Sequence, residues 1–196
     1  MLKYSGGFKA EVGYFKGIDN AVIGYLKEIT AALGEFDQAW RDVDSKPFLD
    51  SCNKALEDAY TKLNTAHVQI AEYFTGIQGI LNQLGGFGSF ELPDLEAVEY
   101  SPITAFDDTV VFDDQKVPGI VSKMRTAARN ICSDVEEFDP YPTSFTGSSD
   151  DVIEKIKDNL SKAAKCYQVL EGPANAILTE VDKVLESYNN RISALK

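Results

Sequence analysis

The residues of this chain that could carry chemistry are a single histidine, three cysteines and several neighbouring acidic pairs. Cys52, Cys132 and Cys166 lie far apart with no Cys-Xaa-Xaa-Cys spacing, and His67 alone cannot supply a histidine-based metal cluster. Cys52 falls in a helical row of apolar residues, where we expect a buried and unreactive thiol. These residues therefore predict no metal centre, no cofactor and no nucleophile.

The acidic pairs at 107–108, 113–114 and 150–151 are immediate sequence neighbours, a pattern typical of solvated loops and helix starts. A catalytic carboxylate pair needs one pocket that gives its two members different environments, and nothing in the sequence indicates one. Calcium binding by the acidic residues at 107–108 and 113–114 stays open, although they lack the spacing and glycine of an EF-hand loop. We therefore interpret the chain as non-enzymatic.

Composition excludes some classes of partner. The 196 residues carry a formal charge of −12, so nucleic acid and anionic membrane surfaces would repel the chain. No apolar run approaches the roughly 18 residues of a membrane span, so we expect no stable membrane insertion. The sequence MLKYSGGFKAEV lacks the apolar region of a signal peptide, which favours either export without a cleaved signal peptide or a cytoplasmic location.

Two segments of the first half have apolar residues at alternating spacings of three and four, which is typical of amphipathic helices. The first stripe runs from Phe15 to Phe36, and the second runs from Phe48 to Leu84. Ser45 is a plausible N-cap for the second helix. Members of the two stripes are Phe15, Ile18, Val22, Leu26, Ile29, Leu33 and Phe36, then Phe48, Cys52, Leu56, Ala59, Leu63, Ala66, Ile70, Tyr73, Ile77, Leu81 and Leu84.

Residues 87–116 lose this helical period and are rich in acidic residues, glycine and proline, as in a linker. The sequence TVVF at 109–112 predicts a short extended piece. Five aromatic residues favour a linker that drapes over a bundle of helices: Phe87, Phe90, Tyr100, Phe106 and Phe112.

The helical pattern returns after the linker and repeats the first half. The stripe from Val117 to Phe138 follows the first stripe at an offset of 102 positions, and the stripe from Val152 to Tyr188 follows the second at an offset of 104. The tripeptide EFD occurs at 35–37 and again at 137–139. We interpret the chain as an internal duplication of a helical hairpin, with hairpins at 1–86 and 117–196 joined by the acidic linker.

Two hairpins with one-sided apolar stripes bury them most simply against each other. The predicted fold is therefore all-α, an elongated antiparallel four-helix bundle in which one chain forms a pseudo-dimer. Gly172 and Pro173 are expected to kink or break the last helical segment, because proline lacks a backbone donor and clashes with the preceding turn.

The turns of the two hairpins carry related tripeptides. The first has WRD, with Trp40 and Asp42, and the second has FTG, with Phe145 and Gly147. Two helices joined by such a turn resemble the Trp-Xaa-Gly family of helical-hairpin proteins exported by type VII secretion systems. Each turn keeps half of the family's motif. The resemblance implies pairing of two hairpins into a bundle, export without a cleaved signal peptide, and protein partners such as the secretion machinery or another helical protein.

The family also carries a Tyr-Xaa-Xaa-Xaa-Asp/Glu export signal. YQVLE matches it through Tyr167 and Glu171, but Tyr167 also occupies an apolar stripe position, which favours a core role. For Trp40 we expect at least partial burial at the hairpin turn.

Three functions remain open from the sequence. The resemblance favours a non-enzymatic protein associated with type VII secretion, as exported substrate, partner or accessory. An intracellular helical adaptor or scaffold is the alternative. The glycine-rich apolar stretch at 73–90 would suit a membrane-active toxin component, but the net charge argues against that function.

Overall fold

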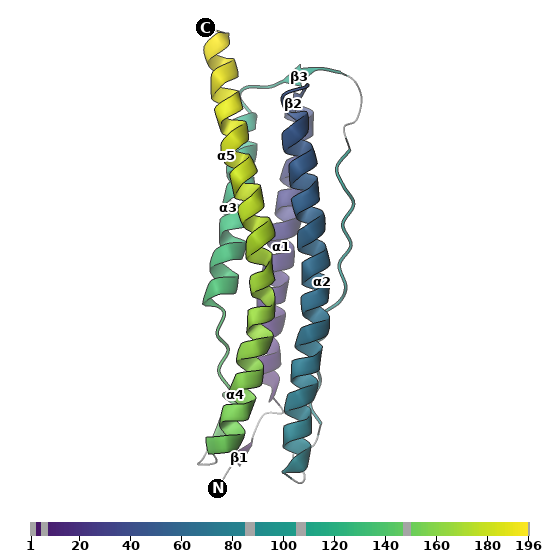
Figure 1. Cartoon of the computed structure of the whole chain (residues 1–196), viewed down its shortest axis with the longest axis vertical. Helices are drawn as coiled ribbons and strands as arrows, with labels where there is room; N and C mark the ends of the chain where they lie inside the picture. The colour runs from purple at the N-terminus through teal and green to yellow at the C-terminus, as the bar shows by residue number, and fades with distance from the viewer. Residues whose placement is uncertain (1–2, 5–7, 85–88, 105–108, 147–149, 196) are drawn as a thin grey trace. The chain divides into compact units, whose positions relative to one another are not determined.

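A computed structural model of the chain describes residues 3–4, 8–84, 89–104, 109–146 and 150–195. It confirms the predicted all-α class, because its helical segments are those of a four-helix bundle and its strands are only two residues long. Figure 1 traces them along the chain. The helices are α1 (Lys9–Ala39), α2 (Lys46–Gln83), α3 (Val117–Glu137), α4 (Asp150–Lys165) and α5 (Glu171–Ala194), with a 3-10 helix, η2 (Cys166–Leu170), between α4 and α5.

The chain divides into two compact units, and each takes residues from both predicted hairpins and from the linker. The first unit consists of Met1–Ala21, Lys62–Val98 and Asp134–Val169. The second unit consists of Val22–Thr61, Glu99–Ser133 and Leu170–Lys196. Helices α1, α2 and α3 contribute to both units, whereas α4 belongs to the first and α5 to the second.

The apolar stripes form the cores, with a few exceptions. Tyr73 is half-buried, and the neighbouring Phe74 is fully buried in its place. A phenylalanine ring needs no hydrogen-bond partner in the interior, whereas a tyrosine hydroxyl does. Leu84 was expected to be buried, but α2 ends at Gln83 and the leucine is 38% exposed.

Short strands join the turn of each hairpin to the segment that precedes the other. In the second unit, β2 (Trp40–Arg41), between α1 and α2, pairs antiparallel with β3 (Val111–Phe112), which precedes α3 (Figure 1). In the first unit, β4 (Phe145–Thr146), between α3 and α4, pairs antiparallel with β1 (Lys3–Tyr4), which precedes α1. The two pairings are therefore reciprocal, since each links a hairpin turn to the segment before the other hairpin.

The last helical segment is interrupted a few residues before Gly172 and Pro173, the position at which proline was expected to break it. The break that we predicted at Gly172–Pro173 lies at η2, and α5 begins at Glu171. Pro173 therefore stands in the first turn of α5, where a backbone N–H has no intrahelical partner and proline is tolerated.

The linker drapes over the helices, as its aromatic residues predicted. In the first unit, Phe90 packs with Phe8 at a centroid distance of 5.0 Å. In the second unit, Tyr100 stacks on Tyr60 at 5.2 Å, and β3 confirms the extended piece expected at 109–112. Phe87 and Phe106 lie outside the described residues.

Candidate functional site

Trp40 lies in the turn between α1 and α2 and is 1% exposed, in agreement with the expected burial. Its indole Nε1 donates a hydrogen bond to Asp42 Oδ2 at 2.8 Å. Asp42 Oδ1 accepts the backbone N–H groups of Asp44 and Ser45 at 2.8 and 2.9 Å. Asp42 therefore closes the turn before α2 through side-chain hydrogen bonds.

Arg191, near the end of α5, reaches the same turn within the second unit. Its guanidinium pairs with Asp42 and lies 3.7 Å from Asp44 Oδ2. It also lies over the rings of Phe112 and Trp40, at 4.5 and 5.8 Å from their centroids. Sequence reasoning missed Arg191, because its position in the last turn of a helix explains a cation there but does not point to the distant turn at Asp42.

The surroundings of Asp42 keep its carboxylate charged. Burial, the largest single influence, raises the pKa, but it is outweighed by the hydrogen bonds from Trp40, Ser45 and Asp44 and by the charge of Arg191. The pKa of Asp42 is therefore below its ordinary value, as expected for a carboxylate that holds a turn together.

Phe145, the counterpart of Trp40, is buried in the first unit. It lies in β4, and its ring contacts Phe8 edge-on at a centroid distance of 5.9 Å. Gly147, the other half of that turn motif, lies outside the described residues. The two turn aromatics Trp40 and Phe145 thus share a structural role, each in its own unit.

Glu11 fixes the chain just before β4. Its carboxylate is fully buried and accepts the backbone N–H groups of Thr143 and Ser144 at 2.6 and 2.8 Å. The Ser144 hydroxyl donates to its second oxygen at 2.7 Å. These charge-assisted bonds hold residues 143–144 against the first turn of α1.

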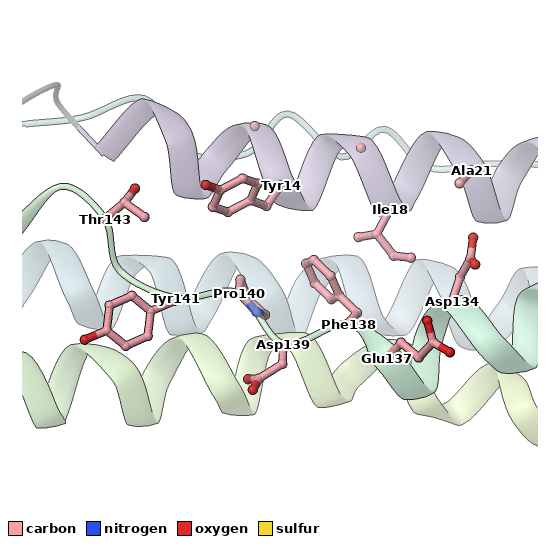
Figure 2. A pocket seen from close by; sticks show the side chains of 12 residues that line it. Tyr14, Ile18, Ala21, Asp134, Glu137, Phe138, Asp139, Pro140, Tyr141 and Thr143 are labelled. Atoms are coloured by element: carbon pink, nitrogen blue, oxygen red, sulfur yellow. The ribbon is translucent and has the colours of Figure 1, made fainter.

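A hollow of about 660 Å³ lies in the first unit between α1 and the chain that follows α3 (Figure 2). Ile18 from α1 and Phe138 from the chain after α3 point toward each other across it (Figure 2). The residues around it come from three places: Gly13, Tyr14, Gly17, Ile18 and Ala21 of α1, Asp134 and Glu137 of α3, and Phe138, Asp139, Pro140, Tyr141 and Thr143 after it.

The hollow combines a bare helix backbone with negative charge. A Cβ added at Gly13 or Gly17 would meet no heavy atom within 4 Å, so another chain can approach α1 closely. Asp134, Glu137 and Asp139 contribute carboxylates, and none of the described residues that line the hollow is basic.

Tyr167 occupies the core of the first unit, as its stripe position predicted. It is fully buried and donates to Asp19 Oδ1 at 3.1 Å, and His67 Nε2 lies 2.6 Å from the same oxygen. Burial and the neighbouring Asp19 carboxylate raise the pKa of Tyr167. Glu171, the other residue of the candidate export signal, is half-buried at the start of α5.

The cysteines have the environment of structural thiols. None of the three forms a disulfide bond, Cys52 and Cys166 are buried, and burial raises the pKa of both. The described part of the chain contains no group of three histidine, cysteine or acidic side chains placed to hold a metal ion. Of the acidic cluster considered for calcium, Asp107 and Asp108 lie outside the described residues, and Asp113 pairs with Lys116 at 2.9 Å.

Within the described residues, no helix has the length and apolar character needed to cross a membrane. Comparisons with protein-family models, with curated proteins and with solved structures found no match.

Proposed function

We propose that this chain is a non-enzymatic helical-bundle protein associated with type VII secretion, which acts through protein–protein contacts as an exported substrate, partner or accessory. The observation that carries the proposal is the duplicated turn. Trp40 and Phe145 are each buried in a hairpin turn that pairs through a two-residue strand with the segment preceding the other hairpin. A paired two-hairpin bundle is what the resemblance to the Trp-Xaa-Gly family implies.

The hollow beside Gly13 and Gly17 is the surface best suited to a helical partner. Exposed glycines let two helix backbones approach closely, and the Asp139 carboxylate favours a partner with a basic side chain. A protein-binding role needs no reactive group, which agrees with the structural environment of the cysteines.

The test compares export in the organism that encodes the chain with export in a strain lacking its type VII secretion ATPase. The protein is expected in the culture medium of the parent strain and in the cells of the deletion strain. An unchanged extracellular level after deletion contradicts the proposal.

The hollow is tested in the parent strain with Gly17→Leu, since a Cβ added at Gly17 meets no heavy atom within 4 Å. Gly24→Leu is the matched control, because Gly24 lies on the same helix, outside the hollow, and also has open space. Export is expected to fall for Gly17→Leu alone. Equal export of the two variants excludes the hollow as the contact surface.

An intracellular helical adaptor or scaffold is the second candidate. The burial of the Trp40 and Tyr167 side chains favours it. Trp40 and Tyr167, through which the resemblance implies contact with the secretion machinery, are 1% and 0% exposed. For an adaptor, the protein stays in the cells of both strains, in a stable complex recovered from the cytoplasm.

A further inference from the structure

Two asparagines of α2 hold the linker in the same unusual way. In the second unit, Asn53 Nδ2 donates to Ile103 O and Asn53 Oδ1 accepts from Ile103 N, both at 2.8 Å. In the first unit, Asn64 Nδ2 donates to Val98 O at 2.8 Å and Asn64 Oδ1 accepts from Val98 N at 2.9 Å. Each side-chain amide thus bonds both backbone groups of one residue. We call these two arrangements the asparagine clamps.

A side-chain amide used in this way replaces the edge of a neighbouring β-strand. It offers one donor and one acceptor to the backbone of an extended segment, as a strand does in β-augmentation. The bonds go to the backbone, so the side chains of the two clamped residues, Val98 and Ile103, take no part in them. The clamps therefore have the chemistry of sites for an extended polypeptide.

Neighbouring contacts agree with this interpretation. The Tyr100 hydroxyl donates to Asn53 Oδ1 at 2.6 Å, and Gln78 Oε1 accepts the backbone N–H of Phe90 at 3.0 Å. The side chains of Val98 and Ile103 remain only half-buried. Backbone bonds rather than deep apolar burial thus hold residues 98 and 103.

The charge of residues 89–104 indicates what kind of segment from another protein could compete with them for the asparagine clamps. Residues 89–104 carry four acidic side chains and no basic one, in a chain of net charge −12. Because residues 89–104 belong to the same chain as the clamps, their effective concentration there is high, on the order of millimolar. A basic segment of another protein would gain electrostatic attraction that residues 89–104 lack.

We propose that the asparagine clamps of α2 are binding sites for an extended, basic segment of a partner protein, and that residues 89–104 occupy them in the unbound chain. The inference goes beyond the proposed function, since it concerns a different surface and holds whether or not the protein is exported.

The probe is a fluorescent peptide with the sequence of residues 89–104 and the changes Glu91→Lys, Asp94→Lys, Glu96→Lys and Glu99→Lys. Its anisotropy is titrated with the full chain and with the full-chain variant Val98→Pro/Ile103→Pro, whose own segment has lost both backbone donors. The peptide should bind the double-proline variant at least about tenfold more tightly than the wild type, because its competitor is weakened. Absence of binding to both proteins, or equal affinity for them, overturns the proposal.

Backbone recognition is tested with the same peptide N-methylated at the Val98 and Ile103 positions. Each methyl group removes one hydrogen bond and keeps the side chain, so the affinity should fall about tenfold or more. Equal affinity of the methylated peptide contradicts recognition through the backbone.

Hydrogen exchange locates the site. In the wild type, saturating unmethylated peptide should speed the amide exchange of residues 89–104, because it displaces them. The double variant Asn53→Ala/Asn64→Ala should show the same faster exchange without any peptide, because it lacks both clamps. Asn190→Ala, an exposed asparagine of α5, is the control and should leave this exchange unchanged. Peptide binding without faster exchange of residues 89–104 places the peptide elsewhere and overturns the proposal.

Discussion

His67 Nε2 lies 2.6 Å from Asp19 Oδ1 in the core of the first unit, and each of the two side chains is 6% exposed. The Tyr167 hydroxyl donates to the same oxygen, whereas His67 Nδ1 has no partner among the described residues. These are the two side chains that bond Asp19 among the described residues, and a buried carboxylate depends strongly on each such partner.

His67→Leu should therefore lower the free energy of unfolding by about 3 kcal/mol, since Asp19 would keep a buried charge with a single donor. The measurement is urea denaturation at neutral pH. Asp19→Asn/His67→Leu is the informative control, because a neutral amide oxygen still accepts the Tyr167 hydroxyl. It should be more stable than His67→Leu alone; if it is equally or less stable, the loss comes from packing around His67.

Glu11 should be a second point of sensitivity in the first unit. Glu11→Gln keeps the size of the side chain but removes its charge. The amide oxygen then holds the backbone N–H groups of Thr143 and Ser144 through weaker, uncharged bonds, and the NH₂ group cannot accept from the Ser144 hydroxyl. We expect a loss of about 2 kcal/mol in the free energy of unfolding and faster amide exchange at residues 143–144. Glu28→Gln, an exposed glutamate on the same helix, is expected to change neither. Unaltered exchange in Glu11→Gln argues against the role given to the carboxylate.

Trp40→Ala should destabilise the second unit by about 3–5 kcal/mol, because it leaves a cavity and removes the indole hydrogen bond to Asp42. Trp40→Phe introduces the residue type that stands at position 145 in the other turn. Its loss in the free energy of unfolding should be less than half of that in Trp40→Ala. Both values come from urea denaturation followed by circular dichroism. In the wild type, the single tryptophan should also show blue-shifted fluorescence that moves to the red on unfolding. Equal losses for the two variants would mean that ring packing contributes little.

The helices could be predicted from the sequence because a stripe with spacings of three and four is a local signal. The turn at Trp40 followed from the loss of that period between Phe36 and Phe48. The exchange of Tyr73 for Phe74 in the core could not be predicted, because the two are neighbours and both fit a helical spacing.

The rest of the candidate site depends on residues that are distant in sequence. Glu11 meets Ser144, and Arg191 meets Asp42, only after the helices have packed. Neither pair has a sequence signal of its own. The asparagine clamps were missed for the same reason, since an isolated asparagine in a helix indicates nothing about its partner. The hollow depends on Gly13 and Gly17, whose spacing is visible but whose open surroundings are a property of the fold.

The turn at Asp42 should make stability depend on acid. Hydrogen bonds and the Arg191 charge lower the folded-state pKa of Asp42, despite burial, below the ordinary value of 3.8. The stabilisation is therefore complete above that ordinary value and is lost as the pH falls through the folded-state pKa. Asp42→Asn should lower the melting temperature at about pH 6, and its difference from the wild type should narrow at about pH 3. Asp50→Asn, with an exposed carboxylate paired to Lys46, should show a much smaller change. A difference between wild type and Asp42→Asn that stays constant over this range would show that the charge of Asp42 does not stabilise the turn.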